Sequence, residues 1–393
     1  MDPKWFPPPN RPLRHGALHA IAANSIGIVT LLLPPGPFRS VIGIPPILWI
    51  AYNLRQYSCG KSEIDYLDAA NVFIGVMRYL DFCVLHVPER VFCRVGAENR
   101  VEAEKDVQNM TLWRKLHWNF DLFMTWRGVG WNWKVKNVDE VPKDMSRGQF
   151  VVQQIIRAGY CFALMDMHDW YFHRTFSLNN GSISPEFFSL PFGRQVLLAW
   201  SSAFNNGCTM AFGYNLMTAV VVASGLSRPQ AWPPMFGSLR KKGYSMRNVW
   251  GYCWHQLHRR SFETANSFLI RMLRIKKGTV ASRLLQLCNA FFLSAILHHV
   301  GSLNQPYSDM VWCQFAFFLM QPVAITIEDL AISLGRSIGL KENRRTRALG
   351  YAWVGVVLSF TLRYPAAAFV TAGVGGARHP VVAKFSITER VFG

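Results

Sequence analysis

The sequence predicts an all-α polytopic membrane protein with about seven to nine transmembrane helices. Half of its 393 residues are hydrophobic and only 17% are charged, against about a quarter in typical globular proteins. The apolar residues are also concentrated in runs, several of which reach the roughly 20 residues that cross a bilayer as a helix. Backbone groups in lipid must be paired internally, so such spans are expected to be helical. The runs lie at 17–33, 41–53, 68–86, 150–166, 194–224, 280–300, 309–335 and 348–371.

The first two runs differ from the others. The run at 17–33 is short, and Pro45-Pro46 interrupts the run at 41–53, so either is expected to form half of a hairpin or an interfacial segment as readily as a span. The later runs are separated from one another by hydrophilic loops. We therefore predict one integral-membrane domain over residues 1–393, without a separate soluble catalytic module.

The formal net charge of +19 is distributed unevenly among the loops. Loop 225–279 contains eleven Lys and Arg residues and one acid, Glu263, whereas nine acids offset the eleven basic residues of loop 87–149. Cytosolic loops of membrane proteins carry an excess of Lys and Arg. We therefore assign loop 225–279 to the cytosol and the positive charge to a bilayer rather than to nucleic acid, and expect a multi-pass protein of the endoplasmic reticulum.

The orientation of the N-terminus is left open by two conflicting observations. Lys4, Arg11 and Arg14 favour a cytosolic N-terminus, but three full spans before residue 87 would place it in the lumen. The same topology predicts a lumenal, glycosylated Asn180 in the sequon Asn-Gly-Ser. The sequence does not specify an oligomeric state.

The first candidate for chemistry is a histidine near the end of an apolar run, in Phe291-Phe-Leu-Ser-Ala-Ile-Leu-His-His-Val-Gly301. On a helix, Ser294 and His298 share a face, and His299 turns about 100° away. An ionisable side chain at membrane depth is costly and is therefore a functional candidate. The alternative is a pair of interfacial histidines at the end of a span.

The second candidate is Asn248-Val-Trp-Gly-Tyr-Cys-Trp-His-Gln-Leu-His-Arg-Arg260. As one helix, it would place Trp250 and Trp254 one turn apart, with His255 and Arg259 on another stripe. The alternative is an amphipathic surface helix, with tryptophans among the lipid headgroups and arginines on phosphates.

Two further patterns involve glycines and acids. In Arg127-Gly-Val-Gly-Trp-Asn-Trp133 the glycines are expected to let the backbone turn closely between aromatic side chains, since no phosphate-loop spacing is present. Glu328 and Asp329 lie inside an apolar run, where they either pair with a basic residue or mark a water-filled cavity. We find no zinc-ligand spacing and predict no metal site.

Four of these segments occur together, and in order, in a known family. Trp232-Pro-Pro-Met-Phe-Gly237 followed by Asn248–Gln256 resembles the "P-x-F-G … F-W-G-R-R-W-H-Q" signature of wax synthase-like membrane acyltransferases. Ser294-Ala-Ile-Leu-His298 is similar to their "S-G-L-L-H" element, and Phe317–Glu328 to "F-F-x-x-Q … E". Arg127–Trp133 resembles the "R-G-x-G-W-x-W" of a fungal branch that acetylates terpenoid and meroterpenoid alcohols. The motif-bearing core spans about 110–335.

This resemblance implies a fold related to the membrane-bound O-acyltransferases, with a chamber open to cytosol and bilayer. It implies acyl-CoA, here acetyl-CoA, as co-substrate, no tightly bound cofactor, and an alcohol acceptor, here a terpenoid. It also implies a paired site in which His298 takes the role of the membrane histidine and His255 that of the second polar residue. Gly-Tyr-Cys replaces Gly-Arg-Arg in the first signature, so His258, Arg259 and Arg260 are expected to supply the basic contacts.

The predicted site therefore combines two catalytic residues with a larger binding set. His298 is the expected general base, and His255 is expected to polarise the thioester carbonyl or orient the donor. Contacts to substrate are predicted for Trp250, Trp254, Gln256, Ser294, Glu328, Arg127, Trp131 and Trp133. Contacts to the coenzyme A phosphates, or alternatively to anionic lipid, are predicted for Arg240, Lys241, Lys242, Arg259 and Arg260.

Two other functions compete with this prediction. A true wax-ester synthase would use a long acyl-CoA and a fatty alcohol. A transporter or structural membrane protein would need neither histidine, but the sequence lacks a repeated pattern of Gly- or Pro-broken helices in its two halves. The Arg127–Trp133 element favours the acetylating enzyme.

Overall fold

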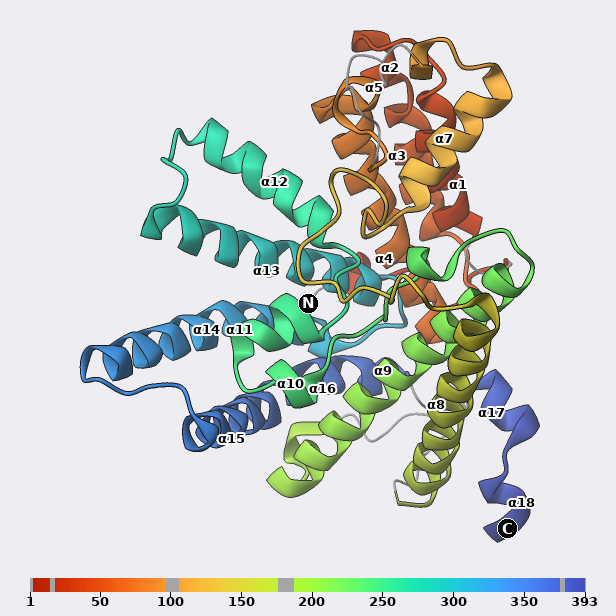
Figure 1. The fold of residues 1–393 in the computed structure, drawn as a ribbon. Helices are drawn as coiled ribbons and strands as arrows, with labels where there is room; N and C mark the ends of the chain where they lie inside the picture. Colours follow the sequence, from red (N-terminus) through yellow and green to blue (C-terminus); the bar gives the residue numbers. More distant parts are fainter. Residues whose placement is uncertain (1–2, 15–17, 96–105, 176–186, 375–378, 393) are drawn as a thin grey trace. The chain divides into compact units, whose positions relative to one another are not determined.

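The computed structural model of the chain describes residues 3–14, 18–95, 106–175, 187–374 and 379–392. Regular structure in these ranges is helical (Figure 1), apart from two isolated bridges that pair Leu13 with Ser58 and Arg94 with Trp131. The predicted helical fold class is therefore confirmed for the described part of the chain.

The chain divides into two compact units. Unit 1 comprises residues 1–136 and 257–311, and unit 2 comprises residues 137–256 and 312–393. The helices of unit 1 are α1 (Leu18–Thr30), α2 (Pro37–Ile42), α3 (Ile44–Leu54), α4 (Ser62–Tyr79), α5 (Pro88–Val91), α7 (Leu112–Met124), α12 (Arg259–Met272) and α13 (Val280–Leu303), with a π-helix at Leu80–Leu85. Those of unit 2 are α8 (Arg147–Thr175), α9 (Phe192–Ala223), α10 (Leu239–Lys242), α11 (Met246–Asn248), α14 (Cys313–Ser337), α15 (Arg344–Thr361), α16 (Arg363–Thr371), α17 (Pro380–Phe385) and α18 (Thr388–Phe392), with a π-helix at Val249–Cys253.

The core of unit 1 forms where α1, α4 and α7 pack together. Leu31, Phe82, Leu122, Phe123 and Trp131 form part of one buried cluster. Burial of these large side chains is the main favourable contribution to the folding of this unit, at roughly 25 cal/mol per Å² of apolar surface.

A buried ion pair joins α2 to α5 in the same unit. Arg39 and Glu89 are 2% and 5% exposed, and the guanidinium binds both carboxylate oxygens, with distances of 2.6 Å (Nη1–Oε1) and 3.3 Å (Nη2–Oε2). Two charges removed from water in this way depend on each other, because each compensates the desolvation of its partner.

In unit 2, α8 and α9 run side by side (Figure 1). Cys161 and Met165 on α8 pack against Cys208 on α9, and Val382 of α17 completes this cluster. The side chain of Asn343 begins α15 by accepting hydrogen bonds from the backbone N–H groups of Arg345 and Thr346, a capping box that includes the Thr346 hydroxyl. The start of α15 is therefore specified by its own sequence.

Three described helices are long and apolar enough to cross a membrane: Val280–Leu303, Asp309–Ser337 and Arg344–Thr371. The prediction of seven to nine spans is therefore not supported. The runs at 17–33 and 41–53 form α1 and the α2–α3 pair, which contain only 13, 6 and 11 residues.

The other apolar runs are not among these three candidates for a different reason. α4 contains buried charged residues, among them Asp65, Asp68 and Arg78. Helices α8 and α9 have 29 and 32 residues, but their sequences are interrupted by polar side chains. A run of apolar residues in the sequence does not distinguish a helix that contacts lipid from one that packs inside the protein.

Replacing Arg39 with Met is expected to lower the free energy of unfolding by about 3–5 kcal/mol, because Glu89 would keep its charge in a buried site. The double variant Arg39→Met/Glu89→Gln should recover most of that loss. Thermal unfolding in detergent measures both changes. Arg347→Ala removes the exposed pair with Glu342, whose side chains are each 52% exposed, and serves as the control with little effect. Equal losses for the Arg39 and Arg347 variants would contradict the expectation.

Candidate active site

His298 lies near the C-terminal end of α13, a helix that begins where the Thr279 side chain accepts a hydrogen bond from the Ser282 N–H. The imidazole is half-buried, and its Nδ1 forms a hydrogen bond with the hydroxyl of Tyr66 on α4. Either group can be the donor, depending on the histidine tautomer. The two ring centroids are 6.0 Å apart. The predicted catalytic histidine thus has an ordered partner within its own unit.

Tyr66 is 8% exposed, and this burial raises the pKa of its phenol above the ordinary value. The hydroxyl is therefore neutral at physiological pH and can both donate and accept a hydrogen bond. Tyr66 was not among the residues predicted from the sequence, because it lies 232 positions from His298 and no spacing rule connects the two. The only signal was its place between two acids, Asp65 and Asp68.

The last turns of α13 pack against α4 at three points. His298 contacts the Tyr66 hydroxyl, and Gly301 faces the Tyr66 ring so closely that a Cβ at this glycine would lie 2.5 Å from Cε2. Asn304 caps α13 and donates from Nδ2 to the carbonyl of Asp65, at 3.0 Å. These contacts fix the position of the tyrosine along α13.

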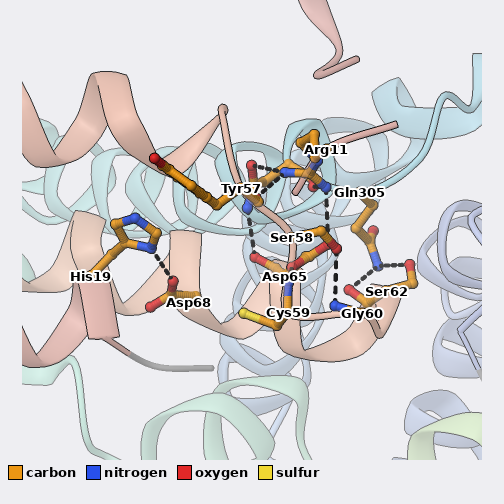
Figure 2. A network of polar contacts seen from close by, with 11 residues as sticks. Arg11, His19, Tyr57, Ser58, Cys59, Gly60, Ser62, Asp65, Asp68 and Gln305 are labelled. Carbon is orange, nitrogen blue, oxygen red and sulfur yellow. Dashed lines mark hydrogen bonds and ion pairs between the residues drawn. The ribbon is translucent and has the colours of Figure 1, made fainter. Parts of the chain in front are cut away.

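A buried polar network holds the first turns of α4 (Figure 2). The carboxylate of Asp65 accepts hydrogen bonds from Arg11 (2.9 Å), the Ser58 hydroxyl (2.7 Å) and the Cys59 N–H (2.6 Å). One turn later, Asp68 is 2.7 Å from Nδ1 of His19. Tyr66 lies between the two acids, so its backbone is held on both sides.

The neighbouring histidine has a different environment. Nδ1 of His299 is 3.4 Å from the carbonyl oxygen of Val311, which agrees with its predicted rotation away from His298. Ser294, one turn before His298, is half-buried on the same helix. Of the two adjacent histidines, only His298 contacts a tyrosine hydroxyl among the described contacts.

The second candidate segment is not the single helix that the sequence predicted. The π-helix at Val249–Cys253 ends at Trp254, whose backbone is extended (φ −74°, ψ 153°), and α12 begins only at Arg259. The predicted stripe of His255 and Arg259 is therefore wrong. The amide of Gln256 explains the break, since Nε2 donates to the carbonyls of Trp250 (3.0 Å) and Trp254 (2.6 Å).

Two of the predicted motifs contact each other in unit 2. The indole N–H of Trp250 donates to Oε1 of Gln321 at 3.1 Å, and its ring packs on Phe317 with centroids 5.9 Å apart. Glu328, 6% exposed, accepts from the N–H groups of Met246 (2.6 Å) and Arg247 (3.2 Å). Helix α14 thus supports the segment that precedes His255.

The acidic pair in α14 has two separate roles. Glu328 binds backbone N–H groups, whereas Asp329 forms an exposed ion pair with the side chain of Arg247. This hydrogen bond raises the pKa of Arg247. The ion pair agrees with one of the two alternatives from the sequence. The predicted contact of Glu328 with substrate stays a prediction, but its described contacts are within the protein.

His255 lies in unit 2 against an aromatic surface. Its ring centroid is 5.3 Å from that of Trp254 and 6.3 Å from that of Phe236. His258, three residues later, belongs to unit 1, where its ring contacts Trp126 at 5.5 Å and Phe262 at 6.3 Å. The two histidines of this segment therefore have different surroundings.

The Arg127–Trp133 segment forms the close turn that its glycines predicted. Gly128 and Gly130 have φ angles of +64° and +79°, which favour glycine. A Cβ at Gly128 would lie 2.5 Å from the ring of Trp133. Arg127 is 7% exposed and Trp131 is fully buried. This segment therefore has a packing role in unit 1, and its predicted contact with substrate stays a prediction.

The basic residues predicted to bind phosphate have varied partners. Arg260 binds both carboxylate oxygens of Asp81 (2.7 and 3.0 Å), and its guanidinium lies 4.6 Å from the Trp133 ring centroid. Arg259 pairs with Glu263 on the first turn of α12.

The basic residues of α10 lie in unit 2, where Arg240 and Lys241 are exposed and Nζ of Lys242 is 4.1 Å from the ring centroid of Tyr252. The Asp139 carboxylate accepts a hydrogen bond from Tyr252 and raises the pKa of this phenol to about 12. The predicted glycosylation site Asn180 lies outside the described residues.

Comparison with known proteins identifies the family. A family model described as "Membrane bound O-acyl transferase family" matches residues 232–320. The acetyltransferase ple2 of Rhodocybe pseudopiperita is 31% identical over 321 residues, covering 78% of this chain and 80% of that protein. The chain belongs to the membrane bound O-acyl transferase family.

Two further relatives extend this result. The acetyltransferase sirH of Emericella nidulans is 25% identical over 348 residues, covering 87% of this chain and 80% of that protein. The O-mevalon transferase macI of Penicillium terrestre is 26% identical over 317 residues, covering 75% and 70%. This membrane bound O-acyl transferase is thus an enzyme that uses an acyl donor and an alcohol acceptor.

Replacing Glu328 with Ala is expected to disrupt the segment that carries Trp250 and His255. Two backbone N–H groups would lose their acceptor, at a cost of about 1–3 kcal/mol each, and activity should fall together with thermal stability. Asp329→Ala is the matched control, because it removes the adjacent carboxylate from an exposed pair. Detergent melting and acyl transfer measure the two effects, and an Asp329 variant that is as unstable as the Glu328 variant would contradict this role.

Proposed function

We propose that the protein transfers an acetyl group from acetyl-CoA to a hydroxyl of a terpenoid or meroterpenoid secondary metabolite, as a multi-pass enzyme of the endoplasmic reticulum. The observation on which this rests is His298 at the end of an apolar helix, hydrogen-bonded to Tyr66 and set in a Ser-Ala-Ile-Leu-His segment similar to the family element. The names of ple2 and sirH support acetyl as the transferred group.

In the proposed reaction, His298 acts as the general base. It removes the proton from the acceptor hydroxyl while the oxygen attacks the thioester carbonyl carbon of acetyl-CoA. The tetrahedral intermediate then breaks its C–S bond, and the leaving thiolate takes the proton back from the imidazolium. The products are the acetate ester and coenzyme A, and no acyl-enzyme forms. General-base assistance of this kind typically accelerates a reaction by about 10²–10⁴.

His255 is proposed to orient the donor or to polarise its carbonyl oxygen. The contacts of Trp254 and Phe236 hold its ring, and a positioned N–H near the developing oxyanion would stabilise the transition state. Phosphates of acetyl-CoA are expected to bind the exposed basic residues of α10, where charge-assisted hydrogen bonds are available. An apolar acceptor would enter from the bilayer.

Replacing His298 with Ala is expected to lower the turnover of the folded protein by about 10²–10⁴, because the proton acceptor is lost. Rates are normalised to folded protein, since the buried Tyr66 hydroxyl also loses a hydrogen-bond partner and stability should fall. Microsomes containing either protein are assayed with labelled acetyl-CoA or palmitoyl-CoA and a panel of terpenoid and fatty alcohols. The wild-type protein should transfer acetyl to a terpenoid alcohol. Transfer of palmitoyl to a fatty alcohol would indicate a wax-ester synthase, and no transfer from either donor, or a fully active His298 variant, would overturn the proposal.

The variants His255→Ala and His258→Ala should distinguish the roles of the two histidines in this segment. We expect the His255 variant to lose about tenfold or more in kcat, as is typical when an electrostatic contact to the transition state is removed, and the His258 variant to retain nearly full turnover. Initial rates at saturating acetyl-CoA, normalised to folded protein, measure this difference. Equal activity of the two variants would remove His255 from the site.

A further inference from the structure

The hydrogen bond between Tyr66 and His298 occupies one of the two ring nitrogens. Nδ1 faces the tyrosine hydroxyl, so a substrate hydroxyl would have to meet His298 at the other ring nitrogen, Nε2. A neutral imidazole has one proton, and a base needs an unprotonated nitrogen. If Nε2 accepts the substrate proton, as the proposed function requires, Nδ1 must hold the resident proton and donate it to the oxygen of Tyr66.

We propose that Tyr66 is the positioning residue that sets the tautomer and the ring orientation of His298. Its hydroxyl oxygen accepts the Nδ1–H hydrogen bond, which places the lone pair of the neutral ring on Nε2, the nitrogen that takes the proton in the proposed reaction. When Nε2 takes the proton, the imidazolium keeps the same Nδ1–H hydrogen bond. The partner is therefore in place before and after proton transfer and needs no rearrangement during the reaction.

The surroundings of Tyr66 suit this role because they hold both its ring and the backbone beside it. Gly301, three residues after His298, leaves room for the ring directly against α13, where any Cβ would lie 2.5 Å from Cε2 and 2.6 Å from Cδ2. Asn304 binds the carbonyl of Asp65, the residue before the tyrosine. The spacing of His298, Gly301 and Asn304 therefore sets the height of the hydroxyl along α13.

The acids beside Tyr66 add a second constraint. Asp65 accepts three hydrogen bonds, and Asp68 binds His19 (Figure 2). Asp68 also accepts a hydrogen bond from the N–H of Ala20. These are buried charged groups, 3% exposed each, which are costly to remove from their partners. Such supporting contacts are what holds a site residue within the small tolerance that catalysis needs.

The test uses Tyr66→Phe, which removes only the hydroxyl and keeps the ring against Gly301. We expect kcat to fall about ten- to a hundredfold, the loss typical of a misplaced catalytic group, while the KM values for acetyl-CoA and the acceptor alcohol stay the same. The matched control is Tyr79→Phe, which removes another buried hydroxyl on α4, one that donates to the carbonyls of Arg39 and Ser40. This control should lower thermal stability and leave kcat unchanged.

A second variant reaches the same contact from the other helix. Gly301→Ala should displace the Tyr66 ring and lower kcat in a similar way, whereas Gly355→Ala on α15, where a Cβ meets no neighbour within 4 Å, should not. If both changes act through one hydrogen bond, the double variant Tyr66→Phe/Gly301→Ala retains the kcat of Tyr66→Phe within about two-fold. Losses that multiply would overturn the proposal.

The outcome also separates this inference from the proposed function on which it rests. Full activity of Tyr66→Phe together with an inactive His298→Ala would reject Tyr66 as the positioning residue and leave the base assignment intact. Full activity of His298→Ala would reject both. A Tyr66 variant that raises KM and leaves kcat unchanged would also overturn the inference, because it would place the hydroxyl in substrate binding.

Discussion

The pairing of buried polar groups is the constraint on which the rest of this structure depends. An unpaired polar group in an apolar interior costs roughly 2–7 kcal/mol, and lipid offers it no partner. The described helices meet this constraint with side chains that bind backbone groups. Glu328 accepts from two N–H groups, Gln256 donates to two carbonyls and Asp65 accepts from the Cys59 N–H. Each of these contacts stabilises an irregular segment next to a helix.

The pairing of buried polar groups also decides which basic side chains can bind a ligand. Arg260 follows the family signature and was expected to meet phosphate, but its described partner is Asp81, with aromatic rings around the guanidinium. The basic residues of α10 are different, because Arg240 and Lys241 are exposed. A positive residue in the sequence therefore says little about ligand binding until its carboxylate partners are known.

The sequence could predict the helical class, the apolar helix that contains His298 and the close turn at Gly128. It could do so because residue type alone decides these features: long apolar runs form helices, and a positive φ favours glycine. The number of spans could not be predicted in this way, since α4 is apolar in its overall pattern but contains Asp68 and Arg78 as buried residues.

The candidate site was predicted less completely than the fold. The break at Trp254 depends on a single amide, that of Gln256, and on the packing of Trp250 against α14. Neither is visible in a helical periodicity. The contact between Tyr66 and His298 depends on how α4 packs against α13. The two residues are 232 positions apart, so no sequence spacing predicts this contact.

The family match covers only part of the candidate site. The matched segment, residues 232–320, contains His255 and His298 but not Tyr66. A comparison restricted to that segment would find the proposed base without the group that orients it. On the proposed mechanism the base is useful only in one tautomer, and that tautomer is set by a hydrogen bond from a different helix. On that mechanism the functional unit would be the pairing of α13 with α4, including Gly301, which leaves space for the phenol ring.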